Sequence, residues 1–344
     1  MNGGAGAIRD RGLTLVADIG GTNARFALAA AHPDGAPRPL EPARFAVADL
    51  ATFEDAVARY LGDVGAKPLC AVLAIAAPVH GETAEITNSP WRIDAAALRA
   101  RFGFTSVRLV NDFAAMSAAV GQLAAGDLQP LGVLAAPDPA DGCDRVLGVI
   151  GPGTGLGVGL LLRHAARTLV IETEGGHASF APTSEEEVAV LRVLWRRFGR
   201  VSNERLISGP GLVTLYAALG EIAGMPAPLT TPETIVTAAG EGSSPLARRA
   251  VELLCELLGS VAGDLALTGG AWDGIYLAGG LVQPLLPWLD RGGFRRRFEA
   301  KGRREAEMTR VPTMAVTRDD AGLLGAAAWA AEGLILPSRR SRST

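Results

Sequence analysis

The chain reads Leu15-Val-Ala-Asp-Ile-Gly-Gly-Thr-Asn-Ala-Arg-Phe-Ala-Leu28 near its start and Val149-Ile-Gly-Pro-Gly-Thr-Gly-Leu-Gly-Val-Gly-Leu-Leu-Leu162 near its middle. In each stretch an apolar run leads into a turn rich in glycine and threonine, and a second apolar run follows. This pattern predicts a β-hairpin with a bare tip. Because each hairpin begins an α/β half of the chain, we expect a duplicated architecture with a cleft between the halves.

Around these hairpins, short β-rich runs alternate with longer helical patterns, which is typical of an α/β protein. The predicted strands are Leu13–Ala17, Ala71–Ala76, Val107–Val110, Val146–Ile150, Leu169–Thr173 and Ile275–Ala278. The predicted helices are Phe53–Leu61, Asp94–Arg101, Phe113–Val120, Glu185–Phe198, Pro210–Leu219, Pro245–Leu267 and Ala321–Ala331. Thr183 or Ser184 can cap the helix that begins at Glu185. A length of 344 residues is sufficient for two domains.

The composition is that of an ordinary soluble globular protein, with 48% hydrophobic and 20% charged residues. A formal net charge of −3 gives no electrostatic reason to expect nucleic acid or an acidic membrane surface. The cysteines, Cys70, Cys143 and Cys255, are far apart and indicate reduced thiols rather than a disulfide or zinc site. Without a secretory or membrane-spanning pattern, we expect a cytoplasmic protein with disordered tails at 1–11 and 337–344.

The hairpin tips are candidates for phosphate binding, because glycine lets backbone N–H groups approach an anion closely. The candidate residues are Gly20, Gly21, Thr22 and Asn23 in the first tip and Gly153, Thr154 and Gly155 in the second. One such turn is equally well explained as a tight hairpin, but two in one chain favour phosphate. A Walker A loop is excluded because Lys67 and Lys301 each follow alanine, and the second tip fails the dinucleotide pattern because Leu156 takes the last glycine position.

Carboxylates at strand ends are candidates for the chemistry. Asp18 ends the first predicted strand, where it can hold Mg²⁺ directly or through water, or simply form an Asx turn. Asn111 and Asp112 lie between a strand and a helix, at the strand end where open α/β sheets bind ligands. A helix N-cap explains one of the two, but a cap does not require both.

Three further clusters combine polar residues with glycines. Glu174-Gly-Gly-His177 follows a strand and offers groups that bind sugar hydroxyls, although a solvated loop histidine is an equal alternative. Glu204 is either a ligand or a first-turn helix acid. Gly279-Gly280 follows a strand and either lies flat against a nucleotide or only turns the chain.

The motifs occur in an order that resembles the bacterial glucokinase family of the hexokinase/actin-like ATPase superfamily. The series is Asp18-Ile-Gly-Gly-Thr-Asn-Ala-Arg25, Asn111-Asp-Phe-Ala-Ala115, Gly153-Thr-Gly-Leu-Gly157, Glu174-Gly-Gly-His177, Glu204-Arg-Leu-Ile-Ser-Gly-Pro-Gly211, Leu277-Ala-Gly-Gly280 and Asp320-Ala-Gly-Leu-Leu-Gly-Ala326. Each motif alone is weak, but seven in order are specific. The resemblance covers Leu13 to Gly333.

The resemblance implies two actin-like (ribonuclease H-like) α/β domains with the active site in the cleft between them. The expected domains are 1–122 with 314–336 and 123–313, with crossover helices near Gln122 and Met314. The resemblance also implies that ATP binds at both hairpin tips, Asp18 and the Gly279-Gly280 turn, with Mg²⁺ at Asp18. It makes Asn111, Asp112, Glu174, His177 and Glu204 the sugar-binding set, with Asp112 as the catalytic base.

The function that this resemblance implies is phosphorylation of glucose at its 6-hydroxyl by ATP, in a homodimer, feeding glycolysis. A related family carries a Cys-rich zinc motif after its Gly-His segment; here no cysteine follows His177 until Cys255, so we expect no zinc and no DNA binding. The alternatives are a kinase for another hexose, a non-catalytic sugar sensor on the same fold, or an actin-like filament ATPase.

Overall fold

The computed structural model describes residues 12–30, 38–77, 79–86, 89–137, 143–164 and 167–331. The chain divides into two compact units. One contains the residues up to Leu123, residues 167–171 and the residues from Arg318 onward; the other contains 124–166 and 172–317. Each strand and helix predicted from the sequence pattern is present. The segment 337–344, for which we predicted a tail, lies outside the described residues.

The first unit is built on a mixed five-stranded sheet with the order β3-β2-β1-β4-β8. Its strands are β1 (Thr14–Ile19), β2 (Asn23–Ala30), β3 (Arg38–Ala46), β4 (Cys70–Ile75) and β8 (Ser106–Asn111). The β1–β2 pair is the predicted antiparallel hairpin, whereas β4 runs parallel to both β1 and β8. A separate small sheet joins β5 (Val79–His80), β6 (Thr83–Glu85) and β7 (Arg92–Asp94).

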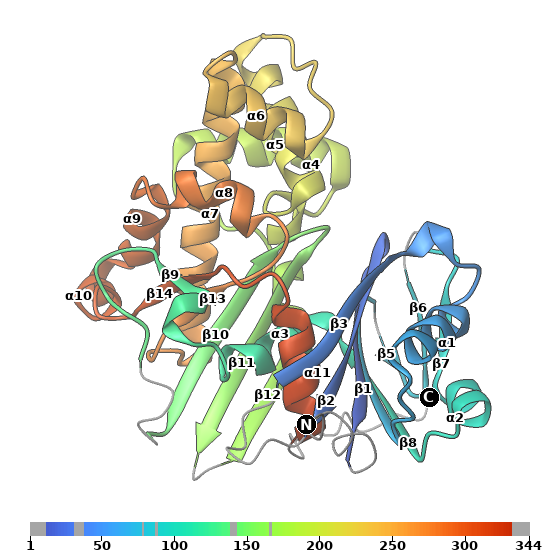
Figure 1. Ribbon diagram of the computed structural model, residues 1–344. Coiled ribbons are helices and arrows are strands. Elements are labelled where there is room, and N and C mark those ends of the chain that lie inside the picture. Colours follow the sequence, from blue (N-terminus) through green and yellow to red (C-terminus); the bar gives the residue numbers. More distant parts are fainter. Residues whose placement is uncertain are drawn as a thin grey trace, which may run out of the picture. The chain divides into compact units, whose positions relative to one another are not determined.

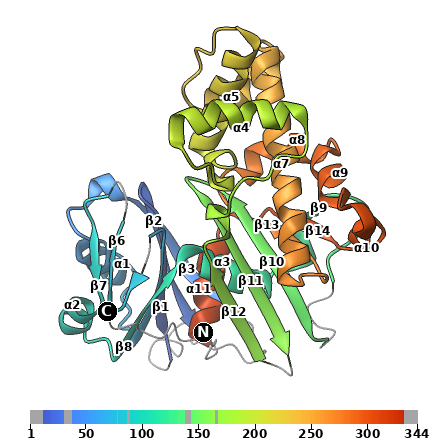
Figure 2. The same ribbon diagram turned by 180° about the vertical axis from the view of Figure 1, so that it is seen from behind.

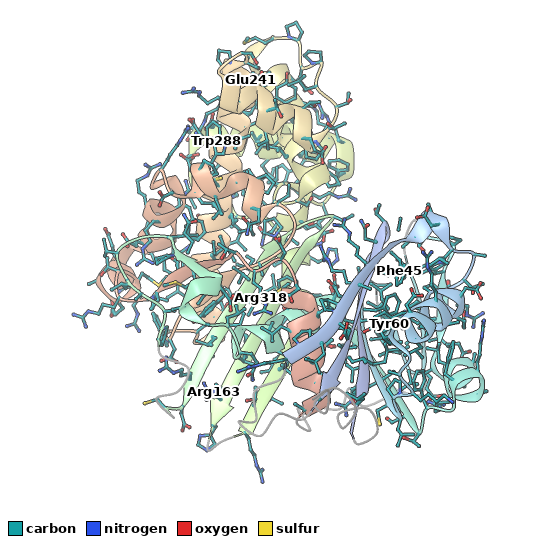
Figure 3. All side chains as sticks on the ribbon, viewed as in Figure 1. Phe45, Tyr60, Arg163, Glu241, Trp288 and Arg318 are labelled. Atoms are coloured by element: carbon teal, nitrogen blue, oxygen red, sulfur yellow. The ribbon has the colours of Figure 1, made fainter. Side chains whose placement is uncertain are left out.

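Helices cover both faces of the five-stranded sheet (Figure 1). Helices α1 (Phe53–Val64) and α2 (Ala95–Phe102) lie on one face, and α3 (Asp112–Val120) and α11 (Ala321–Ala331) lie on the other. Between the sheet and α1, the Phe26 ring stacks with Tyr60 at 5.6 Å and meets Phe45 edge-on at 5.7 Å. Figure 3 labels Phe45 and Tyr60 in this aromatic core.

Helix α11 packs closely because small residues face its neighbours. A Cβ on Gly325 would collide with the backbone of Ala115 in α3, and one on Gly322 would lie 2.5 Å from Asp18 Oδ2. Residues from Ala321 to Trp329 are buried. Helix α11, the last helix that the structure describes, is therefore part of the core of the first unit.

The second large sheet has six strands in the order β12-β11-β10-β13-β14-β9. Its strands are β9 (Leu128–Pro130), β10 (Arg145–Pro152), β11 (Leu156–His164), β12 (Arg167–Thr173), β13 (Ile275–Leu277) and β14 (Thr313–Val316). The β10–β11 pair is the second predicted hairpin, in register from Arg145 opposite Arg163 to Pro152 opposite Leu156. The prediction of a crossover helix near Met314 is wrong, because Met314 lies in β14 and pairs with Tyr276 and Pro130.

Seven helices accompany this sheet within the described residues. They are α4 (Glu185–Phe198), α5 (Gly209–Ala223), α6 (Pro232–Glu241), α7 (Pro245–Gly269), α8 (Val282–Leu289), α9 (Gly293–Glu299) and α10 (Glu305–Met308). Figure 2 shows α4 and α5 beyond one end of the sheet and α7 running alongside it.

Serine and threonine caps explain where several of these helices begin. Ser184 accepts a hydrogen bond from Glu187 N, which decides between the two predicted caps of α4. Ser208, Thr231 and Ser244 cap α5, α6 and α7 in the same way. No helix among the described residues is long and apolar enough to cross a bilayer.

Candidate active site

The tip of the first hairpin is short and exposed. β1 ends at Ile19, Gly20 N donates to Asn23 O at 2.9 Å, and β2 begins at Asn23. Gly21 and Thr22 are exposed. The Asn23 side chain is engaged within the sheet, since its Oδ1 accepts from Arg44 Nε at 3.0 Å. The tip therefore offers backbone groups and the Thr22 hydroxyl to a ligand, while Asn23 contributes to the frame.

Asp18 lies near the end of β1, directly opposite Arg25 of β2 in the hairpin register. Arg25 Nη1 donates to its Oδ2 at 3.2 Å, and the Asp18 side chain is 22% exposed. Burial raises the pKa of Asp18 above its ordinary value, outweighing the opposite effect of the Arg25 charge and hydrogen bond. The carboxylate has no space on the side of α11, where the Cα of Gly322 approaches it.

The groups around Asp18 can be compared with those that a Mg²⁺ ion requires. No group of three or more His, Cys, Asp or Glu side chains able to hold a metal occurs among the residues that the structure describes. Mg²⁺ in phosphate-transfer sites needs only one or two carboxylates, because it keeps several waters and binds the substrate phosphates. A single partly exposed Asp18 fits that pattern.

Asn111 and Asp112 occupy the junction of β8 and α3. Asn111 is the N-cap of α3, since its Oδ1 accepts from Phe113 N at 2.9 Å, and Asp112 Oδ1 accepts from the same N–H at 2.8 Å. Asn111 Nδ2 is 3.5 Å from Ala77 O. The capping explanation thus holds for Asn111, while Asp112 is the first helical residue.

The electrostatic setting of Asp112 differs from that of an ordinary surface acid. Burial, and then the negative charge of Asp18, raise the pKa of Asp112 to about 6, although hydrogen bonding to the Phe113 backbone N–H opposes this. A carboxylate with a pKa near neutrality can accept a proton in the reaction more readily than one with the usual value.

The second hairpin tip is held by the double-glycine turn that follows β13. Leu281 N donates to Pro152 O at 3.1 Å and Ala278 N donates to Ile150 O at 3.0 Å. Gly279 has a φ of 121°, and a Cβ there would lie 2.8 Å from Pro152 O. Gly279 is therefore required by both backbone conformation and close approach. The structure thus places the Gly279-Gly280 turn against Pro152 and Gly153 of the second tip.

The polar cluster of the second unit has His177 between two carboxylates. His177 Nε2 is 3.9 Å from Glu174 Oε2, and His177 Nδ1 is 3.7 Å from Glu204 Oε1. Both distances are too long for hydrogen bonds, so the three side chains keep capacity for a ligand. The turn that carries His177, Gly175–His177, packs on β11, where a Cβ on Gly176 would collide with Leu156.

Glu204 lies in a single 3₁₀ turn, Asn203–Arg205, and not in the first turn of an α-helix. Its Oε2 accepts from Leu156 N, at the tip of the second hairpin, at 2.9 Å. Glu204 therefore contacts the candidate phosphate loop as well as the candidate sugar cluster.

The predicted residues fall into two sets, one in each unit. The first unit holds Asp18, Gly20, Gly21, Thr22, Asn23, Asn111 and Asp112, and the second holds Gly153, Thr154, Gly155, Glu174, His177, Glu204, Gly279 and Gly280. Sequence reasoning missed three participants: Arg25, Gly322 and the N–H of Leu156. Counting outward from the first tip would have found Arg25, since a two-stranded hairpin sets it opposite Asp18.

Comparisons with known proteins agree with one another. The family model described as glucokinase matches residues 15–333. A glucokinase from Xanthomonas oryzae pv. oryzae (strain MAFF 311018) is 46% identical over 331 residues, 95% of this chain and 98% of the relative. A glucokinase from Stenotrophomonas maltophilia (strain R551-3) is 47% identical over 319 residues, 92% of this chain and 95% of the relative.

Solved structures support the same fold. The crystal structure of a glucokinase from an Antarctic psychrotroph has a TM-score of 0.83 and 33% identity, covering 93% of this chain and 99% of that one. A ROK family glucokinase from Streptomyces griseus, in complex with glucose and AMPPNP, has a TM-score of 0.59, covering 92% of this chain and 99% of that one. At 23% identity the second comparison bears on the fold alone.

Proposed function

This chain belongs to the glucokinase family, and we propose that it transfers the γ-phosphoryl group of ATP to the 6-hydroxyl of glucose through the site residues described above. The observation that carries the residue assignment is Asp112, a carboxylate at the end of a sheet strand whose pKa is raised to about 6. The products are glucose 6-phosphate and ADP.

Asp112 is the base in this proposal. The bond between the sugar O6 and the γ-phosphorus forms while the bond from that phosphorus to the bridging oxygen of ADP breaks. The proton of the 6-hydroxyl passes to the Asp112 carboxylate late in the step, because phosphoryl transfer has a loose transition state. The Phe113 N–H and the Asn111 cap hold the Asp112 backbone at the start of α3.

The two hairpin tips bind the phosphates. Backbone N–H groups of Gly20, Gly21, Gly153 and Gly155 offset charge on the phosphoryl oxygens, and Thr22 and Thr154 add hydroxyl donors. Bound Mg²⁺ would neutralise phosphate charge, and Asp18 would hold it directly or through a water. Gly279 and Gly280 lie against the nucleoside part.

Glu174, His177, Glu204 and Asn111 fix the sugar ring so that one hydroxyl reaches the phosphorus. Glucose hydroxyls both donate and accept, which suits two carboxylates flanking an imidazole. Loss of one hydrogen bond to a charged partner costs about 1.5 to 3 kcal/mol, so epimers that misplace one hydroxyl should be discriminated.

ADP production from MgATP by the purified chain tests this function, with glucose, mannose and fructose in parallel reactions. Strong stimulation by glucose alone is the expected result. Equal stimulation by another hexose would replace the substrate, and no stimulation by any sugar in folded, ATP-binding protein would favour a sugar sensor instead.

We further propose that the chain acts as a homodimer in the cytoplasm, where ATP is available. Cys70 and Cys255 are free thiols in the described part of the chain, which suits a reducing compartment. Light scattering of the purified chain at several concentrations tests the dimer, and a monomer mass at all of them would contradict it.

A further inference from the structure

We propose that Glu204 is a positioning residue that couples sugar binding to nucleotide binding, by holding the second hairpin with one carboxylate oxygen and facing the sugar cluster with the other. The inference rests on the proposed function. It goes further by stating that the two ligands increase one another's affinity through this side chain.

The first observation is that the two carboxylate oxygens of Glu204 face different groups. Oε2 accepts from Leu156 N at 2.9 Å, whereas Oε1 is 3.7 Å from His177 Nδ1. The side chain is only 32% exposed, so both contacts are made in a partly desolvated place. A hydrogen bond to a carboxylate is stronger than a neutral one, so the Leu156 bond matters for the hairpin.

The second observation is that the backbone around Glu204 is also attached to the hairpin. Gly209 N donates to Gly153 O at 2.8 Å. Ser208, between them, donates from Oγ to Glu204 O at 2.8 Å and accepts from Gly211 N. The segment from Glu204 to Gly209 is therefore hydrogen-bonded to both ends of the tip, at Gly153 and at Leu156.

The third observation is the lack of space between the tip and this carboxylate. A Cβ on Gly155 would lie 2.5 Å from Glu204 Oε2. The contact atom is the end of a side chain and can move, but moving it breaks the bond to Leu156 N. By contrast, a Cβ on Gly153 would meet nothing closer than Gly280 N at 4.0 Å.

These contacts give a physical route for coupling. A sugar hydroxyl that donates to Oε1 fixes the Glu204 rotamer, and the fixed rotamer holds Leu156 N and the neighbouring amides of the tip in place for phosphate. The first ligand to bind restricts the Glu204 side chain and the tip, which costs conformational entropy. The second ligand does not incur this cost again, so each ligand raises the other's affinity by the same factor.

The test measures binding of AMPPNP with Mg²⁺ by calorimetry, with and without saturating glucose. In the unaltered chain, glucose should lower the AMPPNP dissociation constant by roughly 5- to 20-fold, within the usual range of coupling. Glu204→Ala should bring that factor close to one, and should weaken AMPPNP binding roughly fivefold even without sugar.

Glu174→Ala is the matched control, because Glu174 flanks the same histidine but makes no hydrogen bond to the hairpin in the described structure. It should weaken glucose binding and leave sugar-free AMPPNP binding within about twofold. Equal sugar-free AMPPNP affinities for the two alanine variants, or full coupling in Glu204→Ala, would overturn the proposal.

A second variant approaches the coupling from the nucleotide side. Gly155→Ala should weaken glucose binding roughly fivefold in the absence of any nucleotide, since the new methyl group displaces Glu204. Gly153→Ala, with space for its methyl group, should leave sugar-only binding unchanged. Identical glucose affinities for both would contradict the inference. Failure of the proposed function appears separately, as absent glucose-stimulated ADP production by the unaltered chain.

Discussion

The two glycine hairpins are similar in sequence but differ in how the fold supports them. At the first tip Gly21 and Thr22 are exposed, and a Cβ on Gly20 would meet only Asn23 O at an ordinary 3.6 Å. The second tip is held by hydrogen bonds to Gly209 N and to the Glu204 carboxylate, and the turn at Gly279 packs against it. Similar loop sequences therefore do not imply similar constraint. The first hairpin lies in the same unit as Asp18 and Asp112, the acids of the proposed reaction, whereas the second is held by hydrogen bonds from neighbouring segments.

The largest expected effect concerns the acids of the first unit. Asp112→Asn should lower kcat by a factor on the order of 10² to 10⁴ with glucose binding nearly unchanged, because the proton acceptor is lost while the shape remains. Steady-state kinetics and glucose titration measure the two quantities. Turnover near that of the unaltered chain would remove Asp112 as the base.

The difference in support between the hairpins predicts different tolerance to a methyl group. Gly279→Ala should lower the free energy of unfolding by about 2 to 3 kcal/mol, since φ is 121° and the new Cβ lies 2.8 Å from Pro152 O. Gly20→Ala should change it by less than about 0.5 kcal/mol. Urea denaturation compares the two, and equal losses would contradict the comparison.

The pKa of Asp112 is raised to about 6 from an ordinary value of 3.8. We therefore expect that replacing this acid increases the stability of the chain while it lowers the activity. Because the folded form binds this proton more tightly, its carboxylate costs stability as pH rises from about 4 to above 6. Asp112→Asn should therefore stabilise the chain by roughly 1 to 3 kcal/mol at about pH 8, and by almost nothing near pH 3.

The same ionisation should shape activity. In the unaltered chain kcat/KM should fall below about pH 6, as Asp112 takes up a proton and can no longer accept one. Urea midpoints across pH and initial rates across pH measure the two effects. Asp112 does not titrate in this way if kcat/KM stays constant below pH 6. The same conclusion follows if Asp112→Asn stabilises the chain equally at low and at high pH.

The smallest expected effect belongs to the sugar cluster. Glu174→Gln should raise the glucose KM roughly tenfold with kcat largely kept, since one charged hydrogen bond of about 1.5 kcal/mol is weakened. Sugar-dependent initial rates measure it. An unchanged KM would take Glu174 out of the site, and a large loss of kcat would give it a role closer to that of Asp112.

Local signals in the sequence were enough for most of the fold. Caps such as Ser184 and turn glycines such as Gly199 fix helix ends through contacts a few residues apart. The helix near Met314 was expected from the family resemblance, and the local sequence could not correct it, because β14 is four buried residues and a short apolar run has no period that separates strand from helix.

The site was predictable as residue types but not as contacts. Asp112 and Glu204 were predicted as site residues from their motifs, yet the bond from Leu156 N to Glu204 joins residues 48 apart in the chain. The approach of Gly322 to Asp18 joins α11 to β1, about 300 residues apart in the sequence. Both depend on tertiary packing, which no local pattern encodes.

The late position of α11 in the chain has a consequence for synthesis on the ribosome. The first unit begins at the N-terminus but obtains α11 only when residues 321–331 have been translated. The continuous stretch from 172 to 317 has emerged before then. Although domains commonly fold in order from the N-terminus, here the half that is started first is completed last. Until then, the sheet face that α11 covers stays open, and nascent chains are exposed to aggregation there.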